Sequence, residues 1–280
     1  MDIDAAFGKI NLHIKNNELA MAITEIDSIV SECSENPFVL VKCASLLKVI
    51  GDDKRVTEIF DGIMDILPEN DSARFTIAVA LRGLGDAEDA LLILENVEKN
   101  DGVHRESAKA YHMLGKTQEA LSSVQNIKSM TVSDKILFSE IMCTSKRFDE
   151  AYGTAVELAE SENNSYDTLV NLCSVMILMG REKDAVKLAK SFVKEDKKNV
   201  DALALNAYIM RINGRIPAAA NFAHHALLID QEHIGALETM ALCLIEKRKY
   251  VEAKVLAGVI NNKDPGNPAV IRVLDACRSV

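Results

Sequence analysis

The chain has 280 residues, a length that accommodates one or two ordinary domains. Hydrophobic residues make up 48% and charged residues 26%, a globular balance that excludes general disorder. Aromatic residues are only 5%, and with 13 Gly and 5 Pro the chain lacks the turn residues of an all-β sandwich. The composition therefore favours a helical protein.

The negative charge is concentrated in the N-terminal third. The net charge is −10, and residues 1–100 carry 19 acidic and 9 basic residues, whereas the remaining 180 residues carry 23 of each. A surface that binds DNA or RNA needs several Lys and Arg to replace the counterions of the phosphates. The charge balance therefore disfavours nucleic acid as a partner.

The cysteines and the apolar segments bear on the compartment. No two of the six cysteines have the two-residue spacing of a zinc or redox motif, and such dispersal is typical of a reducing compartment. The chain starts with Met-Asp-Ile-Asp, and no apolar stretch reaches the roughly 18 residues that span a bilayer. We therefore expect a cytoplasmic protein without membrane insertion.

A repeated pattern organises the chain. The segments 85–94, 115–124 and 180–189 each begin with Gly, continue with four mostly polar residues, and then have Ala and an apolar helical stripe. The register extends to eight equivalent positions, spaced by 30 to 34 residues. These positions form the first column: Ala22, Val56, Ala90, Ala120, Ala151, Ala185, Ala219 and Ala253.

Three further columns keep the same register. Twelve residues upstream lies a second column, mostly of small residues: Ile10, Ala44, Ala78, Ala108, Ser139, Cys173, Ala207 and Ala241. Five residues before the first column lies a turn column, mostly of Gly: Asn17, Gly51, Gly85, Gly115, Lys146, Gly180, Gly214 and Arg248. Seven residues after the first column lies an apolar column: Ile29, Ile63, Val97, Ile127, Leu158, Phe192, Ala226 and Ile260.

These columns predict pairs of antiparallel helices. A helix ends at each turn position, where Gly or Asn tolerates the left-handed backbone that reverses the chain. The two small columns then face each other, which lets the helix axes approach at the short end of the usual 8–10 Å range. One such pair cannot bury its apolar face alone, so the pairs must stack on one another.

In chain order, the pattern predicts eight helical pairs and a closing helix. We expect them to form a single domain over residues 1–280. The predicted pairs cover approximately residues 3–36, 37–70, 71–101, 102–131, 132–165, 166–199, 200–233 and 234–267. Residues 268–280 form an amphipathic helix that we expect to cap the open end of the stack.

The pattern resembles the tetratricopeptide repeat (TPR), whose period is 34 residues, over about residues 1–267. The resemblance implies an all-α fold, a right-handed α-solenoid of TPR-like helix-turn-helix repeats. Two features depart from the family. Its aromatic position in the first helix is held only by Tyr111, and the third and fourth repeats are shortened to 30 and 31 residues.

The resemblance also implies a peptide-binding groove on the first helix of each pair. The chaperone-tail clamp of the family, which uses Lys followed four residues later by Asn, is absent from the matching positions, among them Val170 and Glu238. The groove residues toward the C-terminus are mainly aliphatic, which favours an amphipathic helix or a hydrophobic segment as ligand. The candidate partner-binding residues are Val41, Phe75, Val79, Arg82, Val170, Ile177, Leu205, Tyr208, Arg211, Leu242 and Ile245.

Other candidate chemistry lacks its structural context. Gly115-Lys116-Thr117 imitates the end of a phosphate-binding loop, but the earlier Gly is absent and no strand precedes it. His224 and His225 are adjacent and point in different directions from one helix, which disfavours a metal site. We expect no cofactor, no metal and no catalytic site.

The sequence thus predicts a non-enzymatic scaffold or adaptor that binds a protein or peptide partner in its concave groove. Two alternatives remain open at this point. One is a self-assembling structural module, a homo-oligomer in which another copy occupies the groove. The other is a helical-repeat protein that binds nucleic acid, which the aliphatic and acidic groove positions disfavour.

Overall fold

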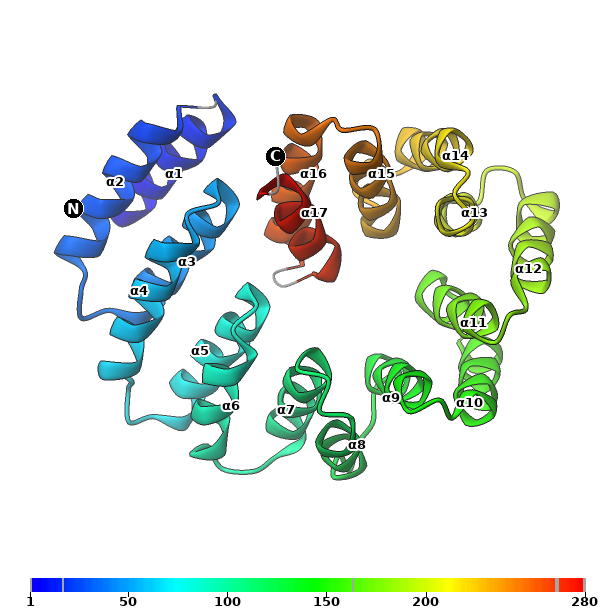
Figure 1. Ribbon diagram of the computed structural model, residues 1–280, viewed down its shortest axis with the longest axis horizontal. Coiled ribbons are helices and arrows are strands. Elements are labelled where there is room, and N and C mark those ends of the chain that lie inside the picture. Colours follow the sequence, from blue (N-terminus) through cyan, green and yellow to red (C-terminus); the bar gives the residue numbers. More distant parts are fainter. Residues whose placement is uncertain (1, 17, 163, 265–266, 279–280) are drawn as a thin grey trace. The chain divides into compact units, whose positions relative to one another are not determined.

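The computed structural model describes residues 2–16, 18–162, 164–264 and 267–278. In these residues seventeen α-helices follow one another and no strand occurs, so the predicted all-α fold is confirmed (Figure 1). In the N-terminal half the helices are α1 (Ile3–Lys15), α2 (Leu19–Glu32), α3 (Pro37–Ile50), α4 (Asp53–Asp65), α5 (Asp71–Leu84), α6 (Ala87–Glu95), α7 (Asp101–Met113) and α8 (Thr117–Gln125). They continue as α9 (Val132–Thr144), α10 (Phe148–Ser161), α11 (Tyr166–Leu178), α12 (Glu182–Glu195), α13 (Val200–Ile212), α14 (Ile216–Ile229), α15 (Ile234–Glu246), α16 (Tyr250–Lys263) and α17 (Pro268–Arg278).

The chain divides into two compact units. Unit 1 comprises residues 1–98 and 257–280, and unit 2 comprises residues 99–256. In unit 1, α1 packs on α2, α3 on α4 and α5 on α6; in unit 2, α7 packs on α8, and the pairing continues to α13 with α14. The expectation of one continuous domain stays a prediction.

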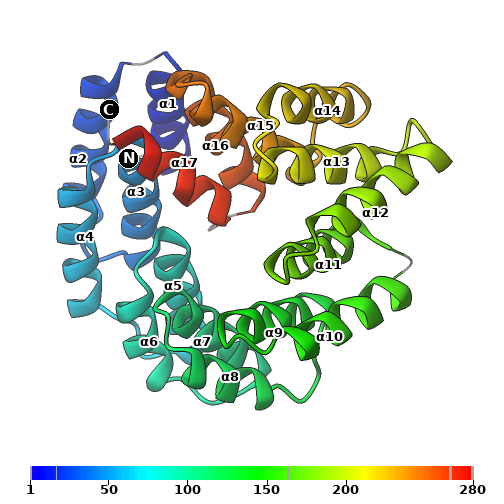
Figure 2. The ribbon, with the colours of Figure 1, turned by 45° about the vertical axis from the view of Figure 1, so that its right-hand side comes forward.

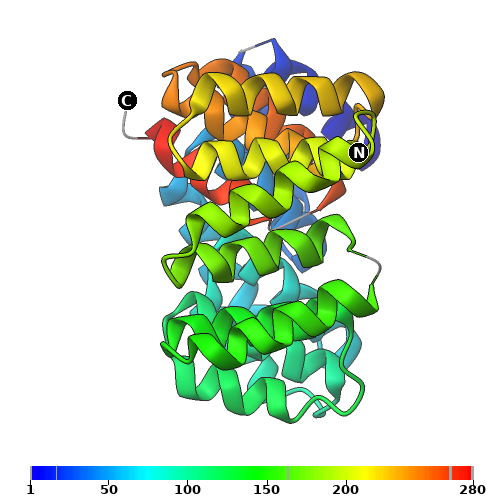
Figure 3. The same ribbon diagram turned by 90° about the vertical axis from the view of Figure 1, so that its right-hand side faces the viewer.

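Unit 2 is layered. The odd-numbered helices from α9 to α15 pack on one another, and each even-numbered helix packs on the odd-numbered helix that follows it. Figure 2 shows α9, α11 and α13 along one side of this unit, and Figure 3 shows its successive pairs, from green to yellow, one above another. The first helices of the pairs therefore form a continuous face, on which the candidate site lies.

The two small columns form the interior of the helical pairs. All sixteen residues are at most 3% exposed, including Ile10 and Val56, the two large exceptions to the small-residue rule. In the apolar column seven members are buried and Phe192 is partly buried against the core of unit 2. The residues that set the repeat register in the sequence are thus those that the helices bury between them.

The turn column has the left-handed backbone that its glycines indicate. Asn17 lies outside the described residues, and the other seven positions all have a positive φ, between 57° and 100°. At the two non-glycine positions, φ is 60° for Lys146 and 57° for Arg248. The next residue closes the turn, since the Arg147 N–H donates to the Met142 carbonyl at 2.9 Å, the bond of a Schellman motif.

Lys146→Gly is expected to stabilise unit 2 by about 0.5–1 kcal/mol, because a Cβ is disfavoured at positive φ and Gly has none. Lys187→Gly is the matched control, since Lys187 is exposed inside α12 and Gly there costs about 1 kcal/mol. Thermal denaturation followed by circular dichroism should show shifts of opposite sign, and a loss of stability in both variants would contradict the turn assignment.

The shortened repeats lose a turn from their second helices. α6 and α8 have nine residues each, against 13 or 14 in the other second helices. An aspartate at the start of the first helix of the same repeat accepts backbone N–H groups of the loop that replaces the missing turn. Asp71 accepts from Glu98 at 2.8 Å, and Asp101 accepts from Lys128 and Ser129 at 3.0 and 2.9 Å.

Candidate functional site

A pocket of about 630 Å³ lies on the first-helix face of unit 2. Its wall comes from α9, α11, α13 and α15, each of which contributes residues from its first two or three turns or its N-cap. Ile136, Val170 and Glu238 share one 34-residue column, and Ser133, Asp167 and Asp201 share another. The pocket exists because consecutive repeats present equivalent positions to the same side of the stack.

The pocket is acidic. Its wall contains four carboxylates, and among the described residues that line it there is no Lys or Arg. His233 is its one imidazole, and the remaining residues of the wall are apolar or carry hydroxyl or amide groups. The four carboxylates come from four helices. They are Glu140 in α9, Asp167 in α11, Asp201 in α13 and Glu238 in α15.

Tyr166 connects two repeats that are not neighbours in sequence. Its ring, from the start of α11, lies edge-on to the His233 ring at the start of α15, with centroids 4.9 Å apart. A Cβ on Gly235 would overlap the outer atoms of the Tyr166 ring, so the glycine makes room for the tyrosine. Burial raises the pKa of the Tyr166 phenol well above its ordinary value, and the neighbouring Glu238, Tyr208, Asp167 and Asp201 add to the shift.

His233 orders one edge of the pocket through both ring nitrogens. Its Nδ1 accepts the Ala236 N–H at 3.1 Å and caps α15, while its Nε2 lies 3.0 Å from an Asp201 carboxylate oxygen. Because Nδ1 accepts a hydrogen bond, the ring proton is on Nε2, and this N–H donates a hydrogen bond to the Asp201 carboxylate. This is the arrangement of a neutral imidazole. The ring therefore orients the Asp201 carboxylate without cancelling its charge.

Two polar side chains of the wall, Ser174 and Asn171, differ in whether they have hydrogen-bond partners. The Ser174 hydroxyl donates to the Val170 carbonyl and lies 2.7 Å from the Tyr208 hydroxyl, which is 34 residues further along. Asn171 is only 4% exposed, and its Oδ1 has no hydrogen-bond partner among the described residues. This oxygen is shielded from solvent and from the open space of the pocket, so its missing hydrogen bond costs free energy within the helical stack.

The structure brings together only part of the predicted groove. Val170 and Tyr208 line the pocket. Leu205 is fully buried in the core of unit 2, and we therefore remove it from the candidate surface. Arg211 lies beside the pocket with its guanidinium 5.9 Å from the Tyr208 ring. The remaining predicted residues are partly buried elsewhere, in unit 2 for Ile177, Leu242 and Ile245, and in unit 1 for Val41, Phe75, Val79 and Arg82.

Sequence reasoning missed the acidic character of the pocket. The column of Ile136, Val170, Ala204 and Glu238 lacks the lysines of the family's clamp and the polar residues of a nucleic-acid reader, and its single acid does not by itself indicate an acidic pocket. The column four residues later, which includes Glu140 and Ser174, contains a second acid. The Tyr166 contact with Gly235 has no counterpart in any column, because it depends on how far the stack curves.

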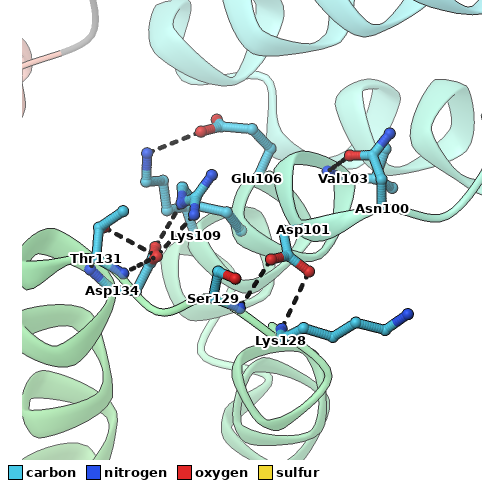
Figure 4. Close-up of polar contacts among 10 residues, drawn as sticks. Asn100, Asp101, Val103, Glu106, Lys109, Lys128, Ser129, Thr131 and Asp134 are labelled. Carbon is cyan, nitrogen blue, oxygen red and sulfur yellow. Dashed lines mark hydrogen bonds and ion pairs between the residues drawn. The ribbon is translucent and has the colours of Figure 1, made fainter.

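The start of α9 is tied to α7 by a buried ion pair (Figure 4). Asp134 is 1% exposed and accepts two hydrogen bonds from Arg105, at 2.5 and 2.7 Å. It also accepts from the backbone and the hydroxyl of Thr131, both at 2.9 Å, in a capping box. Burial acts to raise the pKa of Asp134, but the hydrogen bonds from Arg105 and Thr131 outweigh it and lower the pKa.

Nucleophiles and metal ligands are not gathered at this site. Burial raises the pKa of the Cys173 thiol, and likewise that of Cys43, to about 12, so neither forms a thiolate near neutral pH. In the part of the chain that the structure describes, no group of three or more His, Cys, Asp or Glu side chains could hold a metal ion. None of the described helices is long and apolar enough to cross a membrane.

Comparison with known proteins gives matches only among solved structures. No protein-family model and no curated protein matches the sequence. A tetratricopeptide repeat protein from Parabacteroides merdae is 12% identical, with a TM-score of 0.48 over 86% of this chain and 98% of that chain. The TPR domain of P58(IPK) is 12% identical, with a TM-score of 0.34 over 100% of this chain and 98% of that one. YrrB, described as a TPR protein with an unusual peptide-binding site, is 12% identical, with a TM-score of 0.34 over 77% and 97%.

The type of repeat follows from the chain's own geometry. Hairpins of two helices, buried small residues at two facing positions and a left-handed turn between the helices recur along the described residues. Their 34-residue period is interrupted only where α6 and α8 are short. These are the features of tetratricopeptide-type helical hairpins.

Proposed function

We propose that this protein, a helical-repeat chain of the tetratricopeptide type, is a non-enzymatic adaptor that holds an extended segment of another protein in the pocket of unit 2. The observation that supports this proposal is the pocket itself. Its volume of about 630 Å³ lies within the 300–1,000 Å³ of typical ligand sites and accommodates a few residues of a peptide.

The chemistry of the wall supports a peptide as ligand. Hydroxyl groups of Ser133 and Ser165 can bond a peptide backbone, and Ile136, Val170 and Ile234 offer apolar contact. Since the acidic wall would repel phosphates, nucleic acid is the weaker alternative. The dispersed thiols suit a reducing compartment, so we propose the cytoplasm as the place of action.

The absence of a catalytic arrangement in the described residues is consistent with an adaptor. The acids of the pocket have no adjacent nucleophilic thiol, and the two most strongly shifted cysteines are buried and protonated. The hydroxyl of Ser174 is engaged by Val170 and Tyr208, and no described base of the pocket is bonded to it. We therefore propose recognition without chemistry.

A random library of immobilised 12-residue peptides, probed with the purified full chain, tests this function. We expect the wild type to capture a subset, and Tyr208→Ala to weaken their binding by about tenfold or more, since tyrosines in pockets are frequent hot spots. Lys187→Ala, at an exposed position of α12, is the control and should bind as the wild type does. Failure to capture any peptide, or capture that ignores Tyr208→Ala, would refute the function.

A further inference from the structure

We infer that the segment held in the pocket continues toward the C-terminal ends of the first helices of unit 2, where it presents an Asp or Glu side chain, flanked by apolar residues, to Arg211. The surface that receives it is a strip of five residues at the ends of α11, α13 and α15, which we call the Arg211 strip: Ile177, Leu178, Arg211, Ile212 and Ile245. The inference rests on the proposed function and deepens it, because it names the chemistry of the partner.

The guanidinium of Arg211 is a cation without an anion. It lies in the last turn of α13, and none of its nitrogens has a hydrogen-bond or ion-pair partner among the described residues. Glu246, the acid at the end of the neighbouring α15, is exposed and forms no ion pair with it. Only Nε is fully shielded, so Nη1 and Nη2 remain accessible from the surface. This edge of a guanidinium is the one that a carboxylate binds with two hydrogen bonds.

The surroundings of Arg211 in the strip are aliphatic. Ile177 and Ile245 hold the position of Arg211 in the preceding and the following repeat, and they flank it because α11 and α15 both pack on α13. Leu178 and Ile212 are 58% and 41% exposed, which is unusual for large apolar side chains that adjoin each other on equivalent turns. A partner segment with apolar residues around an acid thus covers the aliphatic side chains and compensates the charge at once.

Apolar positions on both sides of Arg211 favour an acid inside a segment over the carboxylate at the end of a chain. A chain that ended at Arg211 would leave either Ile177 or Ile245 uncovered. The ligand therefore agrees with the apolar segment that the aliphatic groove positions of the sequence favour, and adds an internal Asp or Glu to it.

The acids of the pocket are far enough from Arg211 to admit such a ligand. Asp201 and Arg211 are ten residues apart on α13, about 15 Å along the helix axis. This separation exceeds the Debye length of about 8 Å at physiological salt. Tyr208 connects the two regions, since it lines the pocket and its ring lies 5.9 Å from the Arg211 guanidinium. About five residues of extended chain cover the distance, so a 12-residue peptide spans both.

A double-mutant cycle with the peptides captured from the random library tests the pairing. We expect an Asp or Glu with apolar residues on both sides to recur among them. In each such peptide the acid is replaced by Asn or Gln, and affinities are measured by fluorescence anisotropy for the wild type and for Arg211→Gln. The replacement should weaken binding to the wild type by about tenfold or more and leave binding to Arg211→Gln nearly unchanged.

Two controls accompany the cycle. Arg215→Gln makes the same change in net charge at the exposed N-cap of α14, and the full effect of the acid should persist in it. The peptide that carries the amide should bind Arg211→Gln and the wild type equally, which shows that the variant folds. Amidation of the peptide's C-terminus should change nothing.

The outcomes separate the two proposals. Captured peptides in which the acid is absent, or in which its replacement weakens binding to the wild type and to Arg211→Gln equally, would overturn the inference while the adaptor function stands. A requirement for the free C-terminal carboxylate would overturn it in the same way. Capture of no peptide would overturn both. Self-association that Arg211→Gln abolishes, without capture of acidic peptides, would identify a second copy of this chain as the occupant and would also overturn the inference.

Discussion

Asp134→Asn is expected to lower the stability of unit 2 by about 3 kcal/mol. The substitution keeps the size of the side chain but leaves Arg105 without the carboxylate that accepts both of its hydrogen bonds. Removal of one partner from a buried ion pair typically costs about 3–5 kcal/mol, and Arg105 is partly exposed, which places the cost at the lower end. For a unit of this size the midpoint of thermal unfolding should fall by about 6–12 °C.

Glu150→Gln is the matched control for this prediction. Arg147 and Glu150 form a pair with nearly the same geometry, with hydrogen bonds of 2.7 and 2.5 Å, but both side chains are exposed on the surface. Exposed pairs contribute little because water already solvates both charges. We expect no resolvable change in the midpoint for Glu150→Gln, and equal effects of the two substitutions would show that burial of Asp134 is not what matters.

The contribution of Asp134 also depends on pH. Because its pKa is lowered in the folded protein, the stabilisation is fully present above the unfolded value of about 3.9 and is lost as the pH falls through the folded pKa. The difference in melting temperature between the wild type and Asp134→Asn should therefore be constant near neutral pH and shrink below about pH 4. A difference that grows on acidification would contradict the sign of this shift.

Ala120→Phe is expected to destabilise unit 2 by about 1–3 kcal/mol or more. Ala120 in α8 and Ala108 in α7 are both fully buried where the two helices pack, in the same core cluster. Filling such a contact with a ring forces the helix axes apart and breaks the packing on both sides. The melting temperature and the urea midpoint should both fall, with helical content retained below the transition.

Gln118→Phe provides the comparison for Ala120→Phe. It introduces the same ring into the same helix two residues away, at a position that is exposed. Substitutions at such surface positions usually change stability by less than about 0.5 kcal/mol. If Gln118→Phe were the more damaging of the two, the face of α8 that packs against α7 would be wrongly assigned.

The sequence alone determined the repeat and its interior. The small columns, the turn column and the period are local patterns, because each helical pair buries the same positions against its neighbours. Even Lys146 and Arg248, which lack the glycine of the other turns, were placed by their register and have the positive φ of that column. The shortened third and fourth repeats were visible as spacings of 30 and 31 residues, although not which helix was short.

The composition of the site depended on tertiary structure. Which columns line the pocket follows from the curvature with which α9, α11, α13 and α15 pack, and curvature is a sum of small rotations that no single repeat encodes. That packing brings Tyr166 against Gly235 and gathers four acids from residues 140 to 238. Leu205, by contrast, is buried like its equivalents Leu137, Asn171 and Thr239 in the neighbouring repeats. The periodicity of the sequence predicts which face of each helix packs inward. The distance between residues of two repeats that are not adjacent is set only when the helices pack together.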